Sequence, residues 1–123
     1  MDDLRLCESE ARFMAVVWEA EPVPSGQLAK LCRERLGWQK STTYTVLKKL
    51  ERRGFLKNER AVVTALVPRE RVQGYESGQV VDRTFGGSLP AFVAAFTRER
   101  RLTREEAEAI QALIDRSRAE GGT

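Results

Sequence analysis

Hydroxyl-bearing and basic side chains are concentrated in one stretch of the chain, between residues 38 and 60. This stretch holds seven Lys or Arg and two Asp or Glu, a net charge of +5, whereas the whole chain of 123 residues carries only +3. Short hydroxyl side chains can approach the edges of bases closely, and lysines and arginines bind phosphates. Because both types occur together here, the stretch predicts contact with a nucleic acid.

These side chains form one surface only if the segment from about residue 41 to residue 53 is a helix. The i, i+3, i+4, i+7 spacing of its inward-facing residues predicts a helix, and Gly54 follows as a stop signal. The inward line consists of Thr43, Val46, Leu47 and Leu50. At 100° per residue, Thr45, Lys48 and Arg52 lie on the opposite side, so the free face of this helix is basic and hydroxylated.

Two earlier helices and a hairpin are expected to support this helix. The first runs from Glu8 to Glu19, and the second follows Ser25 as its N-cap and ends before Gly37. The apolar line of the first helix consists of Ala11, Met14, Val17 and Trp18. Between Gly54 and Pro68, a short apolar segment at residues 55–57, a turn candidate at residues 58–60 and a segment rich in β-branched residues at 62–67 predict a β-hairpin.

Three helices and a hairpin in this order are typical of a winged helix-turn-helix. Beyond residue 68, helices are expected over residues 69–85 and 89–96, and a last one begins at a Thr103-x-x-Glu106 capping box. These final 55 residues are too few to enclose a core of their own, so we expect them to pack against a second copy of the chain. The predicted fold is mainly α with a small β-hairpin: a winged helix-turn-helix over residues 1–68 and a helical dimerisation region over residues 69–123.

The winged-helix prediction assigns roles to particular side chains. The residues expected to contact DNA are Lys40, Ser41, Thr42, Thr43, Tyr44, Thr45, Lys48, Lys49, Arg52, Lys57 and Arg60. Arg53 is grouped with the phosphate-binding residues, whereas Thr43 also fits the core and Tyr44 fits either a phosphate contact or packing. The residues expected at the dimer interface are Tyr75, Phe85, Leu89, Phe92, Phe96, Ile110, Leu113 and Ile114.

Composition excludes several other classes of protein. The chain has no histidine, and its two cysteines, Cys7 and Cys32, are not arranged as a metal-binding pair. We therefore expect no metal, no cofactor and no enzymatic activity. The polar N-terminus and the lack of a long apolar run predict a soluble, cytoplasmic protein with no membrane association. Cys32 lies on an apolar helix face and is expected in the core.

Several motifs resemble the penicillinase-repressor family (BlaI/MecI type) of bacterial winged-helix repressors. They are MAVVWE at residues 14–19, WQKSTTYTVLKKL at 38–50, RGFL at 53–56 and FGGSL at 85–89. The resemblance covers roughly residues 6 to 118. It implies a homodimer that binds a palindromic operator and is held together by its C-terminal helices. In many members of the family, the repressor gene lies beside a gene for a membrane-embedded sensor peptidase.

The chain also departs from this family. Antibiotic-responsive members are cleaved at an Asn-Phe bond, and the matching position here is Ala95-Phe96, without the asparagine. Cys7 stands at the N-cap of the first helix, where the family usually has Ser or Thr, and is considered as a redox sensor or an inert residue. Two other functions stay open: a multidrug-type regulator whose phenylalanines bind a small molecule, and a winged-helix module that binds an acidic protein.

Overall fold

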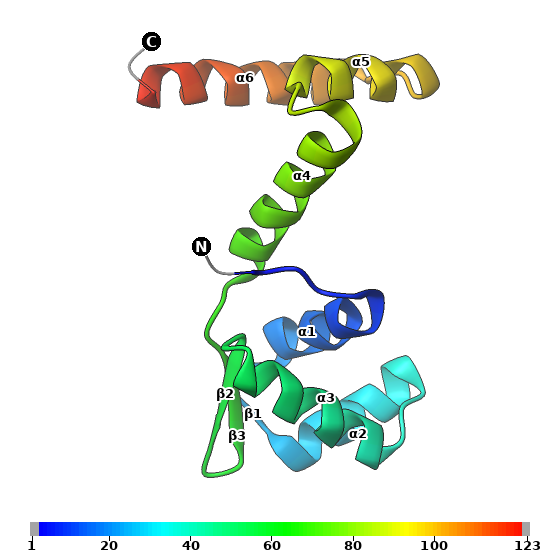
Figure 1. Cartoon of the computed structure of the whole chain (residues 1–123), viewed down its shortest axis with the longest axis vertical. Helices are drawn as coiled ribbons and strands as arrows, with labels where there is room; N and C mark the ends of the chain where they lie inside the picture. Colours follow the sequence, from blue (N-terminus) through cyan, green and yellow to red (C-terminus); the bar gives the residue numbers. More distant parts are fainter. Residues whose placement is uncertain (1–2, 122–123) are drawn as a thin grey trace. The chain divides into compact units, whose positions relative to one another are not determined.

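The computed structural model describes residues 3–121, in which there are six helices and three strands (Figure 1). In chain order they are α1 (Glu8–Ala20), β1 (Val23–Pro24), α2 (Ser25–Leu36), α3 (Lys40–Arg52), β2 (Leu56–Glu59), β3 (Val62–Ala65), α4 (Arg69–Phe85), α5 (Leu89–Glu99) and α6 (Arg104–Glu120). The chain divides into two compact units, residues 1–79 and residues 80–123. The mainly helical fold class predicted from the sequence is confirmed.

In the first unit, three helices and a small sheet pack around one apolar core. Each of the elements α1, α2, α3, β2 and β3 contributes at least one fully buried side chain to it. The largest apolar ones are Phe13, Met14, Val17, Leu28, Cys32, Leu47, Leu50, Phe55, Leu56 and Val63. This order of helices and strands is that of a winged helix, and the core holds α3 against α1 and α2 (Figure 1).

The sheet has three antiparallel strands in the order β1-β3-β2. Val23 pairs with Val63, and Lys57 pairs with Thr64. The β2–β3 loop contains only Arg60 and Ala61, and both have positive φ angles, 53° and 62°. Two-residue hairpin loops favour this left-handed geometry because it matches the twist of the strands. The turn at residues 60–61 therefore overlaps the predicted turn at residues 58–60 only at Arg60, and β1 is an additional strand that the sequence did not predict.

Two details of the expected helices are corrected. Ala11 is exposed, and Phe13 instead is fully buried, with its ring stacked on Trp38 at a centroid distance of 5.9 Å. Ser25 is the first residue of α2 rather than its N-cap, and its N–H donates to the carbonyl oxygen of Ala61 at 2.8 Å. The β2–β3 loop thus accepts from the first N–H of this helix, where no side chain forms a cap.

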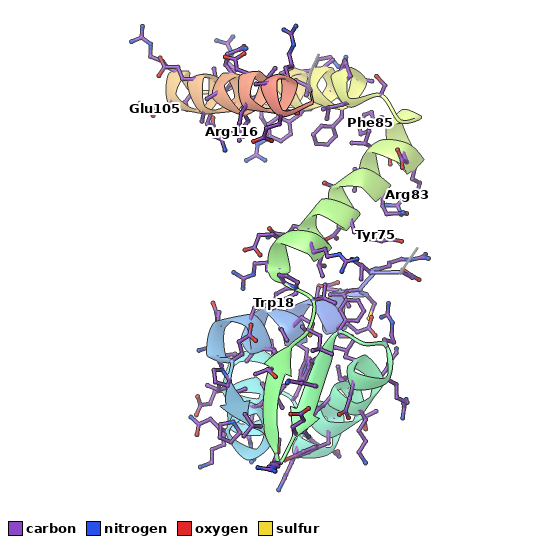
Figure 2. The ribbon with its side chains drawn as sticks, turned by 90° about the vertical axis from the view of Figure 1, so that its left-hand side faces the viewer. Trp18, Tyr75, Arg83, Phe85, Glu105 and Arg116 are labelled. Carbon is purple, nitrogen blue, oxygen red and sulfur yellow. The ribbon has the colours of Figure 1, made fainter. Side chains whose placement is uncertain are left out.

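The first turns of α4 belong to the first unit. Val72 is buried, and Tyr75 packs against the same core while its hydroxyl donates to Asp3 Oδ1 at 3.3 Å. Trp18, labelled in Figure 2, donates from its indole N–H to the Val67 carbonyl oxygen at 3.0 Å, and the Arg69 guanidinium lies 5.4 Å from the ring centroid. These contacts fasten the start of α4 to the winged helix.

The second unit contains the end of α4 together with α5 and α6. Gly86 and Gly87 have φ angles of 58° and 84°, a conformation that glycine adopts without strain. They end α4 and form the turn that leads to α5. Ser88 caps α5 by accepting from the Ala91 N–H at 3.1 Å. The predicted capping box at the start of α6 is confirmed: Thr103 and Glu106 each accept the other's backbone N–H, at 3.0 and 2.9 Å.

Candidate nucleic-acid interface

The two faces of α3 differ in burial as the 100° periodicity predicts. Thr43, Leu47 and Leu50 are buried, and they anchor the helix to the core. The exposed residues are Lys40, Ser41, Thr42, Thr45, Lys48, Lys49, Glu51 and Arg52, and Glu51 Oε2 accepts from the Asn58 N–H at 3.3 Å. Because hydroxyls and cations share this outer face, α3 presents groups suited to base edges and groups suited to phosphates on one surface.

The Thr45 hydroxyl already has a partner within its own helix. Its Oγ1 donates to the Ser41 carbonyl oxygen one turn earlier, at 2.9 Å. The hydroxyl proton is therefore directed at the backbone, and Thr45 offers an oxygen lone pair and a methyl group to anything that approaches the outer face. A lone pair accepts from the amino group of cytosine or adenine, and a methyl group packs against that of thymine.

Thr43 and Tyr44 lie differently from their neighbours on α3. Thr43 is only 1% exposed, so its side chain is part of the core. Tyr44 is half-buried against the core, and its hydroxyl donates to Ser25 Oγ at 3.4 Å. This contact joins α3 to the first residue of α2 and places Tyr44 at the boundary between the outer face and the core.

Glu10 is a buried acidic residue behind the α3 surface, and its role was not predicted from the sequence. Glu10 is 5% exposed, and its carboxylate accepts from the Cys7 N–H at 2.9 Å, which is one half of a capping box. Lys49 Nζ lies 3.1 Å from Glu10 Oε2. Burial alone would raise the pKa of Glu10, but the hydrogen bonds from Cys7 and Lys49 outweigh it, so the pKa lies below its ordinary value. The Cys7-x-x-Glu10 spacing was the available signal, with Cys in place of Ser or Thr.

Arg53 has protein partners rather than a free guanidinium. Its Nη1 lies 3.4 Å from Glu10 Oε1, its Nη2 donates to the Arg5 carbonyl oxygen at 2.6 Å, and its guanidinium lies 4.8 Å from the centroid of the Phe55 ring. Arg53 thus fastens the end of α3 to the segment before α1. Lys48 and Arg52, by contrast, form no ion pair with any residue in the described part of the chain.

The hairpin brings two more of the predicted contact residues to its surface. Lys57 is exposed on β2, where its Nζ lies 3.6 Å from Glu59 Oε2. Arg60 occupies the two-residue loop at the tip of the hairpin and is exposed. The hairpin therefore offers one cation at its tip and one that shares an acidic neighbour.

Most of the predicted interface residues of the second unit are exposed, whereas Phe85 and Phe92 are half-buried. Leu113 is 55% exposed and Leu89 is 59% exposed, and Val93, Phe96, Leu102, Ile110 and Ile114 are also exposed. Phe92 lies between Phe85, labelled in Figure 2, and Phe96, at centroid distances of 5.4 and 6.4 Å. Tyr75 is separate from this group, because it packs within the first unit.

These features define the class of protein. A winged helix with a basic, hydroxylated outer face on its third helix is a DNA-binding fold. Comparison with known families gives the same result, because the sequence model of the family "Penicillinase repressor" matches residues 6–116. The chain belongs to the penicillinase repressor family of transcriptional repressors, and the resemblance drawn from its sequence motifs is confirmed.

One curated relative is a protein of Latilactobacillus sakei described as "Uncharacterized 16.5 kDa protein in ptsI 3'region". It is 28% identical over 110 residues, which cover 86% of this chain and 75% of the relative.

No helix within residues 3–121 is long and apolar enough to span a membrane. The family consists of regulators rather than enzymes, so its match supports a role in transcription.

Proposed function

We propose that two copies of the chain bind a palindromic operator in double-stranded DNA and repress transcription, including that of the chain's own gene. The outer face of α3 carries this proposal, because Thr42, Thr45, Lys48 and Arg52 are exposed there together. In the proposal α3 enters the major groove, where Thr42 and Thr45 contact bases. Occupation of the promoter then excludes the polymerase.

Phosphate contacts supply the rest of the affinity in this proposal. Lys40, Lys48 and Arg52 bind phosphates beside the major groove, and Arg60 at the hairpin tip binds the backbone beside the minor groove. Lys49 and Lys57 contribute less, because each already has a carboxylate within 3.6 Å. Affinity depends strongly on salt, whereas discrimination between sequences depends on the threonines.

The second unit supports the proposed dimer. No residue of α5 or α6 within the described range is buried, although both helices carry apolar faces. Such exposed apolar surface is unfavourable in water and is covered when a second copy packs against it. Residues 69–123 therefore hold two copies together and residues 1–68 bind DNA, with Val72 and Tyr75 fastening the start of α4 to the winged helix.

A gel shift with the DNA upstream of the chain's own gene tests the proposal. We expect a complex that an excess of random duplex does not displace, and complete competition by random DNA would contradict sequence-specific binding. Sedimentation tests the dimer: Leu113→Glu introduces a charge into the exposed apolar face and should give a monomer. The matched control Gln111→Glu adds the same charge on the other side of α6, where Gln111 bonds to Asp115, and should remain a dimer.

One observation favours a second candidate, a regulator that responds to a small molecule. A hollow of about 370 Å³ is lined by Phe85, Phe92, Ala95, Phe96, Glu99 and Arg100. Adding candidate ligands, including β-lactams and copper, to the same gel shift distinguishes the two. Release of the DNA by one of them would support the second candidate, whereas an unchanged complex leaves these aromatics to the dimer interface.

A further inference from the structure

A second basic surface lies beside α3, on α2. A hollow of about 420 Å³ is lined by Gly26, Gln27, Ala29, Lys30, Arg33 and Lys40. A neighbouring hollow of about 470 Å³ shares Arg33 and Lys40 with it and extends to the loop at residues 37–39. We call this joined depression the α2 groove. No acidic residue lines either hollow.

The cations of the α2 groove are free to bind an anion. Lys30, Arg33 and Lys40 are exposed, and none of them forms an ion pair with a residue in the described range 3–121. Arg35, two residues after Arg33 on the same helix, is by contrast paired with Glu19. Gly26, Lys30 and Arg33 follow the i, i+4, i+7 spacing that places them on one side of α2.

The α2 groove is continuous with the outer face of α3. Lys40 lines the groove and is also the first residue of α3, directly before Ser41 on the exposed face. No side chain caps the start of α3, so the free backbone N–H groups of its first turn add positive potential there. Tyr44 bonds to Ser25, the residue before Gly26, and this contact ties the groove to α3.

We propose that the α2 groove binds the DNA backbone, with Lys30 and Arg33 as phosphate ligands that extend the contact beyond α3 and the hairpin. The inference rests on the proposed DNA binding and adds a second track of phosphates to it. The groove is open and has Ala29 on one wall, which suits a continuous polyanion better than a small free anion held in a closed pocket. Lys30 and Arg33 fix the position of the protein on the duplex and do not read its sequence.

The double variant Lys30→Gln/Arg33→Gln tests the proposal through the salt dependence of binding to the upstream DNA. Removing one phosphate ligand flattens the log–log slope by about 0.9, so the slope should flatten by about 1.8 per bound subunit and about 3.6 for a dimer. The ratio of affinities for operator and random DNA should stay the same. Arg35→Gln removes a cation of the same helix that is already paired, and should leave the slope unchanged.

A gain of charge makes the test independent of any loss of folding. Gln27→Lys adds a cation to the α2 groove and should steepen the slope by about 0.9 per bound subunit. A wild-type slope in both the Gln27→Lys and the double variant would overturn the proposal and leave the groove to an acidic protein partner. Failure of the proposed function gives a different result: the wild-type protein itself would then bind upstream DNA no more tightly than random DNA.

Discussion

Replacement of Lys48 by Ala tests whether this residue of α3 binds a phosphate while other residues of the helix contact bases. Lys48 is exposed on the outer face and has no ion-pair partner among the described residues, so its full charge is available to DNA. Lys49 is the matched comparison, because it is adjacent on the same helix and its Nζ lies 3.1 Å from the buried Glu10 carboxylate. We expect Lys48→Ala to weaken binding to operator and random DNA alike.

The magnitude follows from counterion release. Removal of one phosphate ligand per subunit changes the log–log slope by about 0.9, which is about 1.8 for a dimer. Between about 50 and 200 mM salt, the ratio of wild-type to Lys48→Ala affinity should therefore fall about twelve-fold. Lys49→Ala should change the slope by less, because wild-type Lys49 must give up its pairing with Glu10 before it can bind a phosphate.

Fluorescence anisotropy with a labelled operator and a labelled random duplex, titrated at several salt concentrations, measures both quantities. A Lys48→Ala slope equal to that of the wild type would refute the assignment of Lys48 to a phosphate. A weakening confined to operator DNA would show that Lys48 reads bases instead. An equal effect of Lys49→Ala would show that the pairing with Glu10 does not withhold Lys49 from DNA.

Three further predictions concern stability and specificity. Glu10→Gln keeps the capping oxygen but loses the ion pairs with Lys49 and Arg53, and should lower the free energy of unfolding by about 1 kcal/mol at pH 7. The pKa of Glu10 in the folded protein lies below its ordinary value of 4.5, so the stability difference between wild type and Glu10→Gln should be full above pH 4.5 and shrink at lower pH. Urea unfolding followed by tryptophan fluorescence measures this difference, and a value that does not change with pH would contradict the prediction. Ala61→Gly relieves a positive φ of 62° and should raise the unfolding free energy by about 0.5–1 kcal/mol, whereas a decrease would show that the loop is unstrained. Thr45→Val removes the oxygen lone pair that we propose contacts a base. It should reduce the free-energy preference for operator over random DNA by about 1 kcal/mol per subunit in competition binding, while Thr45→Ser should not; an unchanged preference in Thr45→Val would exclude a base contact through the hydroxyl.

Much of the fold could be predicted because apolar spacing and helix-stop signals agreed. Of the predicted inward line of α3, Thr43, Leu47 and Leu50 are buried, and Val46 is half-buried against the same core. The capping box of Thr103 and Glu106 marks the start of α6 correctly. What failed was local: Ala11 fits the helical period, but the larger Phe13 occupies the core because its ring can stack on Trp38, a residue far away in the sequence.

The two-residue strand β1 could not be predicted, because Val23–Pro24 is too short to show a period and its pairing with β3 depends on the tertiary fold. For the same reason, sequence alone gives the charge of a residue but not its partner. Lys48, Lys49 and Arg53 look equivalent in the sequence, yet Lys49 and Arg53 contact Glu10, some 40 residues earlier in the chain. Lys30 and Arg33 appear as ordinary surface charges until α2 is placed beside the start of α3.

Selection of bound DNA from a random-sequence pool is the most direct test of the central claim, that this chain reads DNA as a dimer through the outer face of α3. The account predicts enrichment of two inverted half-sites whose centres lie about one helical turn, or a multiple of it, apart. It also predicts that the Thr45→Val variant, which keeps the cations of α3, still retains DNA from the pool but enriches these half-sites less than the wild type does. Retention of DNA without any enriched sequence, or of a single half-site only, would contradict the account.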